Sequence, residues 1–197
     1  MRVILSYFMS LDGVVQAPGG PEEDTDGGFT HGGWSMPYFD MTAMGSAIDE
    51  VMRSTDALLF GRRTWETMAA AWPARAGDPF ADRMNEITKY VASRTLTHDD
   101  LTWSGSTLLP ADDAIGAVRE LRARSGGGLQ VMGSPTFAAQ LVEQDLVDEY
   151  RLMIEPIMLG GGKRFFPADA KARPLELVSA TTASTGVLIC TYRPAGR

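Results

Sequence analysis

Short runs of apolar residues, bounded by glycine, proline or polar turn residues, recur along the chain and predict β-strands. The first run, from Val3 to Phe8, ends in the turn residues Ser10-Leu11-Asp12-Gly13. Side chains from Tyr150 to Glu155 alternate in the way that a strand does. The other predicted strands are residues 57–60, 89–93, 129–132, 175–180 and 187–192, with a weaker candidate between 101 and 109.

Apolar residues three and four positions apart predict helices between these strands. The longest such pattern covers residues 37–54 and is formed by Met41, Met44, Ile48, Val51 and Met52. Pro37 is suited to the first turn of that helix. The other predicted helices are residues 65–72, a helix capped by Asp112 and closed by the glycines at 126–128, and a helix that begins at Ser134 and Pro135 and ends near Asp145.

Strands that alternate with helices predict a single α/β domain over residues 1–197, with a mostly parallel central sheet flanked by helices. The last two strands are separated by Ser184-Thr185-Gly186 and predict a C-terminal antiparallel hairpin. Residues 18–33 form an acidic, glycine-rich loop that is long enough to be either functional or disordered. Because ligands of such sheets bind at the carboxyl ends of the strands, the loops at that edge are the candidate site.

Composition narrows the class of protein. The chain carries 18 Lys and Arg against 25 Asp and Glu, a net charge of −7, and its 44% hydrophobic content is that of a globular domain. The acidic balance argues against partners such as nucleic acid or an anionic membrane. Cys190 is the single cysteine, which permits no internal disulfide and no cysteine-rich zinc site. With no signal-peptide pattern and no apolar run of membrane-spanning length, a cytoplasmic protein is expected.

Several catalytic chemistries lack their motifs in this sequence. There is no G-x-G-x-x-G, no Walker A loop, no H-E-x-x-H and no G-x-S-x-G. The two histidines, His31 and His98, lie in loop-like segments without companions at metal-ligand spacing. Hydrolysis by a histidine-dependent triad or a zinc ion is therefore not expected, and no metal site is predicted.

Three predicted strands end in short segments suited to phosphate. They are residues 60–64, 91–95 and 132–137, which contain glycine, arginine or the start of a helix. Glycine lets the backbone approach a ligand, helix-start amides favour an anion, and the arginine fork matches phosphate oxygens. Each segment alone is more simply explained as a turn that carries a solvated arginine. Together they predict a cradle for a pyrophosphate and a ribose phosphate.

Four motifs in order along the chain resemble a known family. They are Ser10-Leu11-Asp12-Gly13, Phe60-Gly61-Arg62-Arg63-Thr64-Trp65, Val131-Met132-Gly133-Ser134-Pro135-Thr136, and residues 156–166 with the sequence PIMLGGGKRFF. The chain resembles the dihydrofolate reductase-like fold, and more closely the reductase domain of the bifunctional riboflavin-biosynthesis deaminase–reductase and its stand-alone relatives. The resemblance covers nearly the whole chain.

That resemblance implies a single domain that binds NADPH and transfers a hydride to a small heterocyclic (pterin- or pyrimidine-like) or carbonyl substrate. It places the nicotinamide near the backbone of Phe8 and near Trp34, although a large aromatic at a helix start is also a common core residue. It assigns the loop at 18–33 to a mobile active-site loop. The phosphate contacts that it implies are Gly61, Arg62, Arg63 and Thr64, then Ser93 and Arg94 at the 2′-phosphate, and Gly133, Ser134, Pro135, Thr136 and Phe137 at the pyrophosphate.

The sequence departs from that family in two ways. A zinc deaminase domain needs several cysteine and histidine ligands, so the single cysteine excludes that half of the bifunctional enzyme. The helix expected to face the substrate carries Tyr38, Phe39 and Met41 and few cations, whereas a phosphoribosyl substrate would need arginine or lysine there.

The proton donor and the partners of the chain are left as alternatives. Asp40 is a candidate donor, or a carboxylate that complements a helix N-terminus; Asp12 is a candidate catalyst, or a turn residue. The function is then an NADPH-dependent reductase, a non-catalytic ligand-binding protein on the same fold, or a dihydrofolate reductase proper. Apolar residues in the last strands and in residues 156–166 favour a homodimer.

Overall fold

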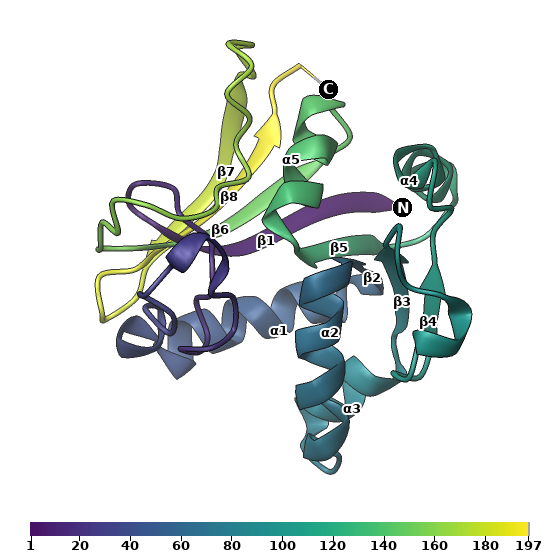
Figure 1. The fold of residues 1–197 in the computed structure, drawn as a ribbon. Coiled ribbons are helices and arrows are strands. Elements are labelled where there is room, and N and C mark those ends of the chain that lie inside the picture. The colour runs from purple at the N-terminus through teal and green to yellow at the C-terminus, as the bar shows by residue number, and fades with distance from the viewer. Residues whose placement is uncertain (197) are drawn as a thin grey trace.

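One eight-stranded sheet organises the chain in a computed structural model that describes residues 1–196 (Figure 1). The strand order is β4-β3-β2-β5-β1-β6-β8-β7. The strands are β1 (Arg2–Ser10), β2 (Thr55–Gly61), β3 (Thr88–Ala92), β4 (Ser106–Leu108), β5 (Gly128–Gly133), β6 (Glu149–Glu155), β7 (Leu175–Thr182) and β8 (Leu188–Pro194).

The first six strands pair in parallel, with β1 between β5 and β6. Leu5 of β1 lies opposite both Val131 and Tyr150, so the most apolar run of the chain occupies the middle of the sheet. Helices cover both faces of this part, which explains why its strands are continuous apolar runs. The helices are α1 (Ser46–Arg53), α2 (Arg62–Ala71), α3 (Pro79–Glu86), α4 (Ala114–Ala123) and α5 (Pro135–Glu143).

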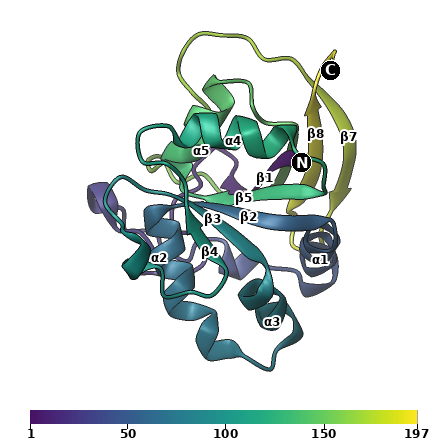
Figure 2. The ribbon, with the colours of Figure 1, turned by 90° about the vertical axis from the view of Figure 1, so that its right-hand side faces the viewer.

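The two faces of the sheet bury two separate hydrophobic clusters. Figure 2 shows α4 and α5 over one face and α1, α2 and α3 over the other. Val118, Leu121 and Leu141 belong to the first cluster, and Trp65, Met84 and Trp103 to the second. This arrangement confirms the predicted α/β domain with a mostly parallel central sheet flanked by helices.

The predicted C-terminal hairpin is also confirmed. β7 and β8 are antiparallel, and β8 pairs antiparallel with β6. β7 is the edge strand, and all of its residues are exposed, including Leu177 and Val178. Figure 1 shows this hairpin standing at one end of the sheet.

A buried carboxylate joins the parallel strands to the hairpin. Glu149, the first residue of β6, is inaccessible to solvent and accepts hydrogen bonds from Arg151 at 2.6 Å and Arg193 at 2.9 Å. Arg2 of β1 is a third partner at 3.4 Å. Burial by itself raises the pKa of Glu149, but the hydrogen bonds from the two closer arginines outweigh it and the pKa is lowered.

Several predicted helix bounds are wrong. Residues 37–54 are not one helix: a 3₁₀ turn (Met36–Tyr38) is followed by a π-helical turn (Met41–Gly45) that leads into α1. The break occurs because Asp40 has extended backbone and caps the second segment. Asp113 rather than Asp112 caps α4, since its side chain accepts from the Gly116 amide. α3 is a helix that the apolar pattern of the sequence did not predict.

Within residues 1–196, the structure contains no helix long and apolar enough to cross a membrane.

Candidate functional site

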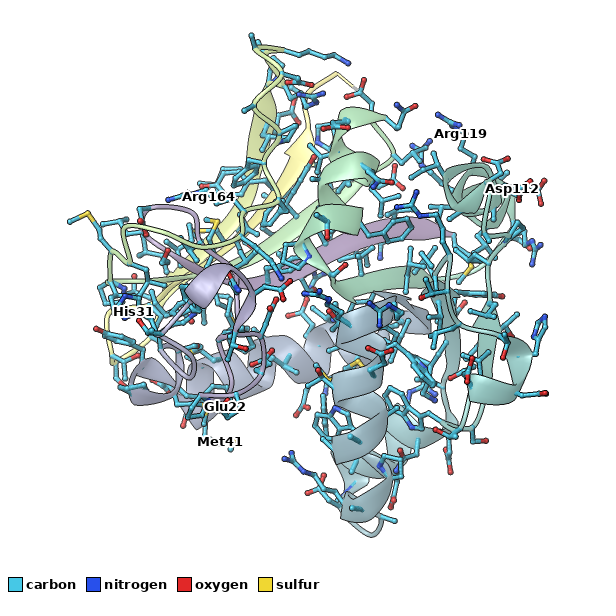
Figure 3. The ribbon with its side chains drawn as sticks, viewed as in Figure 1. Glu22, His31, Met41, Asp112, Arg119 and Arg164 are labelled. Atoms are coloured by element: carbon cyan, nitrogen blue, oxygen red, sulfur yellow. The ribbon has the colours of Figure 1, made fainter. Side chains whose placement is uncertain are left out.

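A groove with a volume of about 2300 Å³ crosses the sheet from the carboxyl end of β5 and the starts of α2 and α5 to the C-terminal hairpin. It is lined by β1 near Phe8, by the loop from Val15 to Asp26, by α1, and by the first turns of α2 and α5. Glu22 from the loop and Met41 from the π-helical turn both line it, and both lie on the same side of the molecule in Figure 3. Asp112 and Arg119 lie on the opposite side, at α4 (Figure 3).

Two glycines bring the ends of β2 and β5 into close contact beneath this groove. A Cβ on Gly133 would lie 2.5 Å from Thr64 Oγ1, and its φ of +143° is one that other residues rarely adopt. A Cβ on Gly61 would collide with Ser134 Oγ. The loops after β2 and β5 therefore pack directly against each other, and the starts of α2 and α5 lie side by side.

The first turns of α2 and α5 are suited to bind an anion. Neither helix has a side-chain cap, because the N-cap residue of α2 is Gly61, which has no side chain, and Ser134 at the start of α5 makes no capping hydrogen bond. The first-turn amides of a helix have no partner inside the helix, and the helix dipole adds positive potential at the same point. Two adjacent starts of this kind fit the pyrophosphate of the cofactor that the sequence resemblance implies.

Of the predicted cofactor contacts, the structure brings one group together at the groove. The residues of this group that line it are Phe8, Arg63, Thr64, Gly133, Ser134, Pro135 and Thr136. Gly61 lies directly behind Ser134. Arg63 forms an ion pair with Asp26 from the loop. Asp26 also accepts from Lys163 at 2.9 Å, so the acidic loop meets basic side chains at the groove wall.

The remaining predicted contacts lie outside the groove. Arg62 does not line it and pairs with Glu66 at 3.0 Å. Ser93 Oγ accepts from the amides of Thr95 and Leu96, and the exposed Arg94 follows it without reaching the groove lining. Of the three arginines predicted to contact the cofactor, only Arg63 therefore lines the groove.

Two predicted aromatic contacts are core residues. Trp34 is 6% exposed, and its indole N–H donates to the Gln16 carbonyl at 2.7 Å. Phe137 packs inside the cluster under α5. Neither side chain lines the groove. The structure thus favours the core interpretation of Trp34 that the sequence left open.

The two candidate proton donors are held as carboxylates. Asp40 accepts from the amides of Thr42 and Ala43 and from Ser184, and the hydrogen bond from the Ser184 hydroxyl is the main reason its pKa is lowered to about 2. Asp12 accepts from Ser10 at 2.6 Å, which lowers its pKa to about 2. A carboxyl with so low a pKa holds no proton to donate at neutral pH. Neither residue lines the groove.

Sequence reasoning missed a buried carboxyl group beside the groove. Glu155, the last residue of β6, is inaccessible to solvent and accepts from the Met9 amide at 3.1 Å and from Ser35 Oγ at 2.7 Å. Burial raises its pKa to about 7. Ser35 lines the groove beside the apolar Phe8 and Phe39. The sequence signal was Glu155 itself, a charged residue at the end of a buried strand and directly before Pro156.

Residues 1–196 contain no group of three or more histidine, cysteine, aspartate or glutamate side chains placed to hold a metal ion.

Comparisons with known proteins agree with this geometry. A family model described as the RibD C-terminal domain matches residues 1–189. The protein YyaP of Bacillus subtilis (strain 168) is 27% identical over 201 residues, which covers 97% of this chain and 94% of YyaP.

Solved structures share the fold at lower identity. A putative riboflavin biosynthesis protein from Shewanella sp. PV-4 superposes with a TM-score of 0.73 at 19% identity, covering 98% of this chain and 99% of its own. A dihydrofolate reductase from Enterococcus faecalis, solved with NADP(H), gives a TM-score of 0.58 at 15% identity over 98% of this chain and 96% of its own. The chain belongs to the RibD C-terminal domain family and has a dihydrofolate reductase-like fold.

Proposed function

We propose that this protein is an NADPH-dependent reductase that transfers a hydride to a small, uncharged heterocyclic or carbonyl substrate. Membership of a reductase-domain family supports an oxidoreductase role. The dihydrofolate reductase of similar fold was solved with NADP(H), and a second structure of the same fold is described as a pyrimidine reductase-like protein from Corynebacterium diphtheriae, with a TM-score of 0.61 and 14% identity over the whole chain and 92% of its own.

The paired starts of α2 and α5 are the observation that carries this proposal. Gly61 and Gly133 hold the two helix starts together because a side chain at either position would collide with the opposite loop. Thr64 and Thr136 both line the groove at these helix starts. These groups would hold the cofactor's phosphates, and the bound reduced nicotinamide would supply a hydride.

The other end of the groove favours a substrate without phosphate. Met36, Phe39 and Ile189 give it an apolar lining. Arg151, which also lines the groove, is engaged by Glu149 at 2.6 Å and Glu50 at 3.3 Å. A phosphorylated substrate would have to compete with these carboxylates for the guanidinium, whereas a planar neutral ring needs only apolar contact.

Cofactor binding tests the proposal directly. NADPH should raise the melting temperature, since a ligand that binds only the folded state stabilises it by mass action. Arg63→Ala should weaken NADPH binding about tenfold or more, since a hydrogen bond to a charged group is worth about 1.5–3 kcal/mol. Arg119→Ala, on the far side of the molecule, is the matched control and should bind normally. No thermal shift at millimolar NADPH would show the proposal to be wrong.

One observation favours a second candidate, a non-catalytic ligand-binding protein. Asp40 and Asp12 both have lowered pKa values and cannot supply the proton that a reduction consumes. The same observation disfavours a dihydrofolate reductase proper, which relied on Asp40. Oxidation of NADPH in the presence of pterins, quinones or flavin precursors would exclude the binding-only candidate; NADPH binding without any turnover would support it.

We also propose that the protein forms a homodimer and works in the cytoplasm, where the buried Cys190 stays a thiol. Among the residues that the structure describes, β7 is an edge strand that pairs with β8 alone, and Leu177 and Val178 are 57% and 47% exposed on it. An uncovered apolar edge of this kind is a site of strand pairing or of packing between copies.

A further inference from the structure

Ser35 and Glu155 connect the groove to the interior of the protein. Ser35 lies between the active-site loop and the 3₁₀ turn, and it is 3% exposed, at the groove wall. Its hydroxyl donates to Glu155 Oε1 at 2.7 Å. Glu155 lies behind it at the end of β6, opposite Ser10 of β1.

Glu155 has no charged partner to compensate its burial. Its other oxygen accepts from the Met9 amide, and within residues 1–196 no arginine, lysine or histidine forms an ion pair with it. Two charged residues of the neighbouring loops bind other groups instead of Glu155. Asp12 accepts hydrogen bonds from the Leu159 and Gly160 amides. Lys163 forms ion pairs with Asp24 and Asp26 of the active-site loop. A buried carboxyl without a cation favours its neutral, protonated form.

A hydrogen-bonded acid behind a groove-lining hydroxyl has the geometry of a proton relay. We propose that Ser35 and Glu155 supply the proton that accompanies hydride transfer in this groove, with Ser35 in contact with the substrate and Glu155 acting through it. This inference rests on the proposed reductase function, and it provides the proton source that Asp40 and Asp12 do not.

The step balances for reduction of a C=N or C=O bond. The carbon accepts a hydride with its two electrons from the reduced nicotinamide, and the π bond breaks towards the heteroatom. In the neutral acid the proton lies on Oε1, so the hydrogen bond to Ser35 is reversed and Glu155 donates to Ser35 Oγ. The heteroatom then takes the hydroxyl proton of Ser35, while Ser35 Oγ accepts the carboxyl proton of Glu155. Glu155 is left as a carboxylate and regains a proton from solvent through the same hydroxyl after product leaves. The substrate is reduced, and the nicotinamide is oxidised.

A purely structural role makes a different prediction from the relay. Glu155→Gln keeps an oxygen to accept from the Met9 amide but carries no titratable proton. Ser35→Ala removes the connection, and Ser35→Thr retains a hydroxyl at the same position. Glu120→Gln, an exposed carboxyl on α4, is the matched control.

The experiment combines spectroscopy, binding and turnover on these variants. Infrared titration should show a protonated-carboxyl band that disappears as the pH rises through neutrality in wild type and Glu120→Gln, and that is absent in Glu155→Gln. NADPH affinity should stay within about twofold in all variants. With 7,8-dihydrobiopterin and phenanthrenequinone as probes, kcat should fall about 100-fold or more in Glu155→Gln and Ser35→Ala, the usual loss when a general acid is removed. Ser35→Thr should recover most of it.

The outcomes separate the two proposals. The relay is overturned if the carboxyl band is missing in wild type, or if Glu155→Gln turns over the probes with the wild-type rate and pH profile. If NADPH fails to bind, or no probe is reduced by the wild type, the proposed function is wrong and the relay has no reaction to serve. If probes are reduced independently of residue 155, the reductase stands and the relay alone is excluded.

Discussion

Replacing Glu155 with glutamine should change how the stability of the protein depends on pH. The carboxyl is inaccessible to solvent, and burial raises its pKa from 4.5 to about 7. In the unfolded chain the same group ionises near its ordinary value. Between these two values the folded state therefore holds one more proton than the unfolded state at this position, so the contribution of Glu155 to stability is highest at low pH and falls as the pH rises.

The size of the effect follows from the displacement of the pKa. At about 1.4 kcal/mol per pH unit, the change from 4.5 to about 7 corresponds to a loss of roughly 3 kcal/mol, most of it between pH 5 and 8. Glu155→Gln has no proton to lose, so its stability should lack this slope. Asp12 and Asp40 have pKa values lowered to about 2, so they titrate below this window, and both proteins share them.

Urea unfolding at several pH values between 5 and 8 measures this difference. The quantity to monitor is the free energy of unfolding of wild type minus that of Glu155→Gln, which removes contributions common to both. We expect it to fall by about 2.5 kcal/mol across the window and to level off above pH 7. A difference that stays constant with pH would refute the reasoning, because it would mean that Glu155 is ionised at the same pH in the folded and unfolded states.

Three further predictions concern the paired helix starts at Gly133, the buried ion pairs of Glu149, and the exposed edge strand β7. Gly133→Ala should lower stability by roughly 1–3 kcal/mol and abolish the NADPH thermal shift, because its Cβ would meet Thr64 at a φ of +143°; an unchanged thermal shift would argue against the cradle. Glu149→Ala should cost about 3 kcal/mol in urea unfolding, the lower end for a buried ion pair because two of its arginines are half exposed and can turn to solvent. Light scattering should give twice the 21.3 kDa chain mass, and Leu177→Lys should shift it towards one chain; a monomeric wild type would contradict the dimer.

The sheet was predictable because its strands carry local signals. Apolar runs bounded by turn residues located the buried strands, and their alternation with helices implied parallel pairing. The apolar spacing over residues 37–54 predicted one continuous helix, which is wrong because such spacing does not reveal where the backbone leaves the helical conformation. Asp40 has extended backbone and caps the π-helical turn that follows it, so the helix is interrupted there. α3 was missed although Asp78 and Pro79 form a good helix start, since its apolar residues are few.

The candidate site was predictable only where backbone sets its geometry. The rule that ligands bind at strand ends pointed to the loops at Gly61 and Gly133. That prediction needs only the course of the backbone and no knowledge of where side chains point. Arg62 and Arg63 are adjacent in sequence, but only Arg63 lines the groove, because neighbouring residues on a helix point in different directions. The raised pKa of Glu155 depends on burial by segments that are far away in the sequence, such as those of Met9 and Ser35. This environment exists only in the folded chain, so the sequence pattern does not show it.

β6 carries a carboxyl at each of its two ends, and acid affects them in opposite ways. Glu149 at its start is stabilising as a charged group, so its contribution is lost when the pH falls through its lowered pKa. Glu155 at its end is most stable when neutral, so its penalty appears when the pH rises. One short strand thus carries, at its first residue, a carboxyl that secures the hairpin through its charge and, at its last residue, a carboxyl that the fold favours without charge.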